Sequence, residues 1–291
     1  MKTSKKVAAV AGIASLLWLA LTAAVGASQR KLVFNPGFKR NAPRQRSKGH
    51  RTRAVVFRAK DGTRLSGWLM TPIKVDLRGA VIYFGGRSED VSWVARDAER
   101  MFAGMTVLVV DYRGYGKSQG IPGEEHIVSD ARMLFDWMAQ RDHVDPNKIA
   151  VVGRSLGSGV AVQVAMKRPV HSLVLITPYD SILAIARKRF RTVPVGFVLR
   201  HKFESVKYAS LLTAPTYVLR SAFDDVVPHS HTDLLVAKLT TLYLDETIPG
   251  SDHFDIPHLN ITQDRIANFL RAQFLLRPVQ SALDTDKPVL A

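Results

Sequence analysis

The chain of 291 residues contains no cysteine. Disulfide bonds, thiolate metal sites and a cysteine nucleophile are therefore excluded, although a chain without thiols tolerates either redox compartment. Acidic residues are missing from the N-terminal part, because no Asp or Glu occurs before Asp61. The sequence also lacks an internal repeat, which excludes a repeat architecture.

The missing acids concentrate the positive charge at the N-terminus. Residues 1–60 hold 14 Lys and Arg, whereas residues 61–291 hold 27 basic and 25 acidic side chains. The net charge of +16 therefore belongs to an N-terminal arm, and the remaining body is nearly neutral. The body has no basic stripe with interleaved aromatic residues, so we expect no nucleic-acid partner.

An uncharged apolar segment, VAAVAGIASLLWLALTAAVG, occupies residues 7–26. Its length matches a helix that crosses a bilayer and exceeds the apolar core of most signal peptides. We therefore favour a single-span transmembrane anchor over a cleaved signal peptide that ends near Ala27. Residues 1–28 are assigned to this anchor or signal segment.

The side of the membrane on which the body lies is ambiguous. Three lysines precede the apolar segment, and six basic residues follow it within residues 30–46. The positive-inside rule would keep the body in the cytoplasm. The likeness to a signal sequence favours the periplasmic or extracytoplasmic side, which we prefer. Residues 29–53 are predicted to be a basic juxtamembrane linker, either lying against anionic headgroups or solvated and flexible.

Residues 54–276 alternate between strand and helix patterns. Asp61-Gly62 is a hairpin turn between the apolar segments 54–59 and 64–71. Continuous apolar runs, typical of strands buried on both faces of a parallel sheet, follow at 79–84, 105–112, 148–153, 171–177, 214–220 and 240–248. Helical periodicity marks residues 124–141 and 261–276. The sequence predicts one α/β domain with a doubly wound, mostly parallel sheet and an N-terminal antiparallel hairpin.

Two segments differ from this pattern. Residues 180–210 are longer than a plain crossover and mix basic with apolar residues. They predict either a lid over the strand ends or a crossover helix with a solvated basic face. Residues 277–291 have little apolar content and predict a flexible tail.

The segment Gly153-Arg154-Ser155-Leu156-Gly157 has the pattern G-x-S-x-G between a predicted strand and a predicted helix. A serine on such a tight turn has its hydroxyl above the sheet, and the two glycines leave room for the turn. We interpret Ser155 as a nucleophile, the alternative being a helix N-cap. Arg154 is expected at the surface, the alternative being a contact with the substrate.

A serine nucleophile needs a base and an acid that orients it, and in this architecture the acid precedes the histidine. Asp224 and Asp225 follow the seventh predicted strand, and His253 follows the eighth. Ligands bind at the carboxyl ends of strands in open α/β sheets. We therefore predict His253 as the base and prefer Asp224 as the acid, with Asp225 capping the next turn.

An oxyanion site needs two backbone N–H groups. Leu156 supplies one at the helix N-terminus, and Arg87 supplies the other from the loop after the third strand. Gly85 and Gly86 in that loop allow the backbone to approach a substrate closely. This chemistry needs no cofactor and no metal.

Seven motifs, in their order along the chain, resemble the α/β-hydrolase superfamily. They are DGTRLSGWLMTP, VIYFGGRSED, VLVVDYRGYGKSQG, VVGRSLGSGVAV, TPYDSI, SAFDDVVP and GSDHF. The resemblance is closest to its small membrane-anchored serine hydrolases, which include protein-depalmitoylating thioesterases. It spans roughly residues 30–275 and implies nucleophile, acid and base roles for Ser155, Asp224 and His253. The chain departs from the family at Gly85-Gly86, where His-Gly is usual.

The residues together predict a membrane-anchored serine hydrolase that cleaves carboxylic esters or thioesters through an acyl-enzyme. The expected substrate is a small-molecule or lipid-like acyl compound, and the sequence does not define the oligomeric state. The alternative is a non-catalytic, membrane-tethered binding protein that keeps the hydrolase fold.

Overall fold

The computed structural model describes residues 2–36, 47–74 and 77–276. Its centre is an eight-stranded sheet in the order β1-β2-β4-β3-β5-β6-β7-β8. The strands are β1 (His50–Arg58), β2 (Arg64–Pro72), β3 (Ala80–Phe84), β4 (Thr106–Val110), β5 (Ile149–Arg154), β6 (Ser172–Ile176), β7 (Thr216–Phe223) and β8 (Leu242–Asp252). Every predicted strand is present.

The sheet directions confirm the predicted architecture. β1 pairs antiparallel with β2, with Arg58 opposite Arg64, and β2 pairs antiparallel with β4. All other neighbours are parallel. The central strands β3, β4, β5 and β6 are buried at every position, which explains their continuous apolar sequences.

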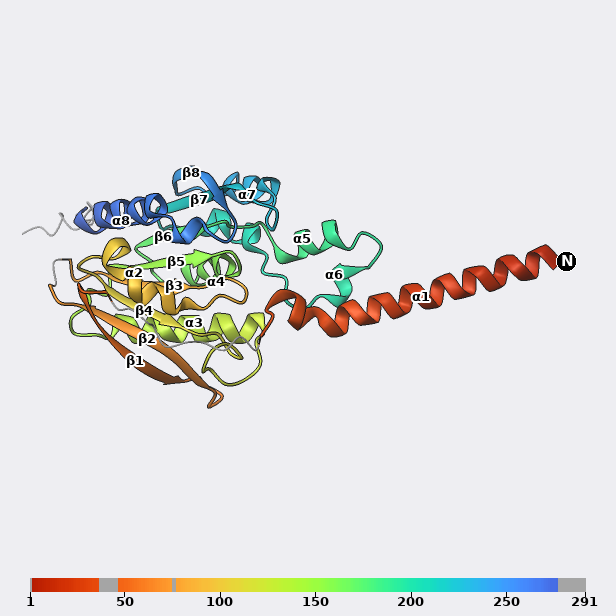
Figure 1. Cartoon of the computed structure of the whole chain (residues 1–291), viewed down its shortest axis with the longest axis horizontal. Helices are drawn as coiled ribbons and strands as arrows, with labels where there is room; N and C mark the ends of the chain where they lie inside the picture. Colours follow the sequence, from red (N-terminus) through yellow and green to blue (C-terminus); the bar gives the residue numbers. More distant parts are fainter. Residues whose placement is uncertain (1, 37–46, 75–76, 277–291) are drawn as a thin grey trace, which may run out of the picture.

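Helices cover both faces of the sheet (Figure 1). α2 (Val94–Met101) and α8 (Asn260–Leu275) pack into one core, and α3 (Glu124–Ala139), α4 (Leu156–Ala165) and α7 (His229–Val236) pack into the other. Alternate residues of each central strand enter the two cores, as Val81 and Ile82 do on β3. Short 3-10 turns lie at Val91–Trp93, Ser205–Lys207, Ala209–Leu211 and Ile256–His258.

A long N-terminal helix, α1 (Lys2–Val33), projects from the body (Figure 1). Within it, Ala11–Val33 is long and apolar enough to span a membrane by length and composition, a test that a signal sequence also passes. The helix continues past residue 28 because its last turn belongs to the core: Val33 and the following Phe34 are 7% and 0% exposed. The first residues of the expected linker are therefore helical.

The other end of the expected linker is also ordered, because β1 begins at His50 and pairs with Pro72. Between these ends, residues 37–46 lie outside the described residues. The expected flexible tail, 277–291, likewise lies outside them.

The segment 180–210 folds into α5 (Ile182–Arg189), the one-turn helix α6 (Val195–Val198) and two of the 3-10 turns. In Figure 1, α5 and α6 stand between the carboxyl ends of the strands and α1. We call residues 182–199 the α5–α6 cap. It lies over the edge of the sheet at which β5 and β7 deliver the candidate site residues.

Candidate active site

Ser155 lies on a strained turn between β5 and α4. Its φ of 48° and ψ of −117° are values that non-glycine residues rarely adopt, and such strain persists only where the surroundings enforce it. Its side chain makes no capping hydrogen bond to α4. Instead, its Oγ lies 2.9 Å from Nε2 of His253. The geometry is therefore that of a tight strand-to-helix turn that directs a largely buried hydroxyl at His253, rather than that of a serine N-cap.

Both glycines of the motif lie so close to other backbone atoms that no side chain fits at either position. A Cβ on Gly157 would lie 2.0 Å from the carbonyl oxygen of Phe84, and a Cβ on Gly153 would lie 2.4 Å from the carbonyl oxygen of Gly157. α4 can pack this tightly against β3 and β5 only without side chains at these positions. The tight packing holds Ser155 at the end of β5.

His253 and Asp224 come from the ends of β8 and β7. Nδ1 of His253 lies 2.9 Å from both carboxylate oxygens of Asp224, and both side chains are almost fully buried. Burial alone would raise the pKa of Asp224. Hydrogen bonds from His253, the Val227 N–H and the Ser221 hydroxyl outweigh it and hold the pKa below its usual value. Asp224 is thus fixed as a carboxylate that can orient the imidazole.

Asp224 takes both of the roles that were predicted for Asp224 and Asp225, orienting His253 and capping the next turn. Oδ1 of Asp224 accepts hydrogen bonds from the N–H groups of Val226 and Val227, at 3.1 and 2.7 Å. The same carboxylate therefore caps the turn and faces His253. The side chain of Asp225, which was expected to cap this turn, is exposed and lines a neighbouring cavity.

The two expected oxyanion donors, Leu156 and Arg87, line one cavity together with Ser155. Leu156 is the first residue of α4, so its N–H has no carbonyl one helical turn before it. Arg87 lies in the loop after β3 and lines the same cavity as Ser155 and Leu156. Gly85 and Gly86 pack against protein groups: the Gly85 carbonyl accepts from the Tyr112 hydroxyl, and the Gly86 N–H donates to Glu89 at 2.5 Å.

A buried ion pair supports this arrangement. Nη1 of Arg154 donates to Oε2 of Glu89 at 2.9 Å, and both side chains are less than 10% exposed. Nη2 of Arg154 donates to the carbonyl oxygen of His253 at 2.8 Å. Glu89 also accepts from the Tyr83 hydroxyl and the Trp93 indole N–H. The prediction of a surface Arg154 is wrong, because the arginine turns inward to neutralise Glu89.

A cavity of about 490 Å³ opens beside Ser155 and His253. Its size falls in the range of about 300–1,000 Å³ that is usual for ligand pockets. The walls come from the Ser155 turn, the loops after β3, β7 and β8, the α5–α6 cap, and the end of α1. The site can therefore hold a substrate whose reacting group sits at the serine and whose remainder lies against the cap.

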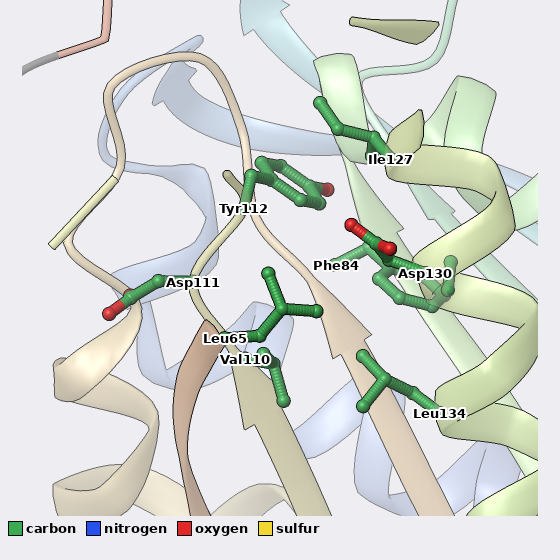
Figure 2. Close-up of a pocket in the computed structure, with 9 residues that line it drawn as sticks. Leu65, Phe84, Val110, Asp111, Tyr112, Ile127, Asp130 and Leu134 are labelled. Carbon is green, nitrogen blue, oxygen red and sulfur yellow. The ribbon is translucent and has the colours of Figure 1, made fainter. Parts of the chain in front are cut away.

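A second hollow, between the end of β4 and α3, is too small for a substrate (Figure 2). Its volume of about 10 Å³ is near the minimum for one water molecule. Asp130 lies beside it and is paired with Arg113 at 2.7 Å. Asp111 points away from the hollow in Figure 2, and its backbone carbonyl accepts from the Ser118 hydroxyl at 2.8 Å.

Sequence reasoning missed two contributors to the site. One is Glu89: the sequence shows an acid three residues after Gly86 and a lone cation, Arg154, in an apolar run, but neither signal identifies the other residue as its partner. The other is α1: its apolar length predicts only an anchor, although Val25, Gln29 and Leu32, which line the cavity, have the spacing of one helix face. In residues 2–36, 47–74 and 77–276, no group of three or more His, Asp or Glu is placed to hold a metal ion.

Comparison with known proteins places these features in context. Residues 76–188 match the family model described as Serine aminopeptidase, S33. The uncharacterized protein Rv2307c of Mycobacterium tuberculosis is 31% identical over 264 residues, which cover 90% of this chain and 94% of that protein. The alpha/beta hydrolase domain-containing protein WAV2 of Arabidopsis thaliana is 25% identical, with 79% of this chain and 78% of WAV2 covered.

Solved structures share the fold. Acetyl xylan esterase from Paenibacillus sp. R4 aligns with a TM-score of 0.63 at 20% identity, covering 77% of this chain and 84% of the esterase. Acetyl xylan esterase 1 from Thermoanaerobacterium sp. aligns with a TM-score of 0.62 at 17% identity, covering 84% and 92%.

Proposed function

The chain belongs to the α/β-hydrolase superfamily, and we propose that it is a serine hydrolase that cleaves carboxylic esters or thioesters through an acyl-enzyme on Ser155. The observation that carries this proposal is the distance of 2.9 Å between Ser155 Oγ and His253 Nε2, with Asp224 at the other ring nitrogen. The esterase names of two structural neighbours support ester chemistry.

In the proposed reaction, Ser155 Oγ attacks the acyl carbon while His253 accepts its proton. Asp224 holds Nδ1 of His253 protonated and stabilises the imidazolium that forms. The N–H groups of Leu156 and Arg87 stabilise the oxyanion; the Gly86 N–H is already bonded to Glu89, which supports Arg87 as the second donor. His253 then protonates the leaving alcohol or thiol, and water releases the acyl group by the reverse sequence.

We propose that the enzyme acts as a single-pass membrane protein, with α1 as its anchor. The likeness of the N-terminus to a signal sequence is the ground on which we propose the extracytoplasmic side for the catalytic body, against the positive-inside rule. Support for the anchor comes from the length and composition of Ala11–Val33 and from the exposure of its apolar side chains, such as Leu16 and Leu17 at 67% each. Exposed basic residues flank the end of this helix, including Arg30 and Lys31.

The test uses the full chain and the variant Ser155→Ala. We expect the variant to lose hydrolysis of p-nitrophenyl esters by at least about 10⁴-fold and to lose labelling by a fluorophosphonate probe, because the nucleophile is absent. Ser230→Ala, at an exposed serine of α7, is the matched control and should keep both. Undiminished hydrolysis by Ser155→Ala would refute the assignment. A wild type that resists labelling would favour the non-catalytic binding protein.

A further inference from the structure

The cavity beside Ser155 has one wall made by the N-terminal helix. Val25, Gln29, Leu32 and Val33 of α1 line it, with the spacing of a single helix face. The facing wall is the α5–α6 cap, whose lining residues include Ile185, Phe190, Val195 and Val198. α1 is therefore part of the pocket as well as a candidate anchor.

The wall formed by α1 and the cap is almost wholly apolar. Gln29 is its polar member on α1, and its amide joins α1 to the end of the cap. Nε2 donates to the Val198 carbonyl at 3.2 Å, and Oε1 accepts from the N–H of Arg200, the first residue after the cap, at 2.7 Å. The polar lining residues apart from Gln29 and Arg189 belong to the Ser155 turn and the loops around it. The wall thus presents methyl and methylene groups to a ligand.

The cap follows α1 over several helical turns toward its N-terminus. Trp18 Nε1 donates to the Thr192 carbonyl at 2.5 Å, eleven residues before Gln29 along the helix. That separation is roughly 16 Å at 1.5 Å per residue. The exposed side of the same stretch is apolar, with Leu19 and Leu21 at 55% and 46%. A membrane that receives α1 therefore meets the cap as well.

The surface of the cap combines an exposed aromatic side chain with exposed basic side chains. Phe197 of α6 is 94% exposed. Arg187, Lys188, Arg189 and Arg191 are all exposed at the end of α5 and just after it. An exposed aromatic side chain among basic residues is the composition that binds at a lipid headgroup interface.

We propose that the cavity between α1 and the cap is a binding site for the acyl chain of a long-chain ester or thioester dissolved in the bilayer, with α1 as its fixed wall. This inference rests on the proposed function, since it places the chain of the acyl group whose carbonyl reacts at Ser155. The chain enters along α1 and need not cross water. The site therefore selects for chain length through apolar contacts on α1 and the cap.

The test narrows the cavity from the α1 side in the full chain. We compare Val25→Trp with Ala24→Trp, a matched control at the adjacent residue, which is exposed and outside the cavity. Both are assayed in one detergent on p-nitrophenyl acetate and p-nitrophenyl palmitate. We expect Val25→Trp to lower the ratio of kcat/KM for palmitate over acetate by at least about tenfold, while Ala24→Trp changes it less than about twofold.

A second variant, Val25→Ser, tests the same contact in case the tryptophan variant misfolds. It removes apolar contact without adding bulk, and we expect the same ratio to fall by about threefold to tenfold. A ratio unchanged in both Val25 variants would overturn the acyl site while leaving ester hydrolysis in place. Failure of the proposed function has a different signature: no ester is hydrolysed, and Ser155 is not labelled.

Discussion

Arg154 and Glu89 meet inside the protein, next to Ser155 and between two loops of the candidate site. Burial would raise the pKa of Glu89, but the neighbouring Arg154 guanidinium and the Gly86 N–H lower it below its usual value. The pair thus fixes two loops. Glu89 accepts from the Gly86 N–H in the loop after β3, and Arg154 donates to the carbonyl oxygen of His253 in the loop after β8. Arg154 is a positioning residue that connects three segments of the site.

Removal of Arg154 should destabilise the fold strongly. In Arg154→Met, Glu89 is left buried without its counter-charge, so we expect a loss of about 3–5 kcal/mol in the free energy of unfolding, measured by urea denaturation. The pKa of Glu89 should then lie above its usual value. Glu89 of the folded variant then binds a proton more tightly than Glu89 of the unfolded chain. The stability of the variant therefore falls as pH rises from the usual pKa of Glu89 to the raised one. The loss of unfolding free energy relative to the wild type is larger at neutral pH than near pH 4.

The matched control for this change is Arg168→Met. Arg168 pairs with Asp136 at 2.5 Å, but both side chains are substantially exposed, at 31% and 46%. Exposed pairs contribute about 0–1 kcal/mol, so the control should unfold almost as the wild type does. Equal destabilisation in the two variants would contradict the role given to the buried pair.

At this scale, sequence reasoning chose residues well where the local motif restricts the options. Ser155, Asp224 and His253 were selected from strand order and loop position, and the structure brings them within hydrogen-bonding distance. Whether they are catalytic stays a prediction. The partner of Arg154 could not be predicted, because Glu89 is 65 residues away and only the sheet order brings β3 beside β5.

The unit β5–Ser155–α4 shows how two elements hold one residue in an unfavourable conformation. The positive φ of Ser155 opposes folding, and the packing of α4 on β3 and β5 outweighs it. That packing depends on the bare backbone of Gly157 beneath the Phe84 carbonyl. The strain at the serine and the glycine contact are therefore linked through α4.

The substitution Gly157→Ala should displace α4. Its Cβ would lie 2.0 Å from a backbone oxygen, which no side-chain rotation relieves. We expect a loss of about 1–3 kcal/mol or more in the free energy of unfolding and a large decrease in fluorophosphonate labelling. Gly12→Ala is the control, because its Cβ meets nothing within 4 Å. Wild-type labelling and stability in Gly157→Ala would refute the packing argument.

Elements with strong periodicity were predicted to within one or two residues, as for α3 at 124–139 and α8 at 260–275. β8 was predicted to end at residue 248 but continues to Asp252, through a β-bulge opposite Ser221 and Phe223. Its last four residues are Pro249, Gly250, Ser251 and Asp252, which carry no apolar strand pattern, and the pairing with β7 extends the strand. Apolar patterns cannot reveal such ends, because backbone hydrogen bonds decide them.

At the scale of the whole molecule, the N-terminal helix and the body share one core. Phe34 packs edge-on against His201 and Phe203, with ring centroids 4.9 and 6.1 Å apart. The sequence predicted the helix from its apolar length. It could not predict this contact, because hydropathy does not separate a lipid-facing side chain from one that enters a core.

Phe34→Ala should therefore destabilise the body. The side chain is fully buried, and truncation of a buried phenylalanine costs about 3–5 kcal/mol. Leu17→Ala, on the helix that precedes Phe34, is the control: Leu17 is 67% exposed, so unfolding of the body should be unchanged. Thermal or urea unfolding in detergent measures both. If Phe34→Ala unfolds at the same temperature or urea concentration as the wild type, α1 and the body do not share a core.

The continuity of α1 with the core also determines how the protein carries mechanical load. A slack connector between anchor and enzyme would absorb a lateral pull from the membrane before the enzyme felt it. Here the helix ends at Val33 and the next residue is already core, while Gln29 and Trp18 bond to the cap. In the proposed membrane-anchored enzyme, tension on α1 or a tilt of this helix would thus be transmitted directly to the walls of the cavity beside Ser155.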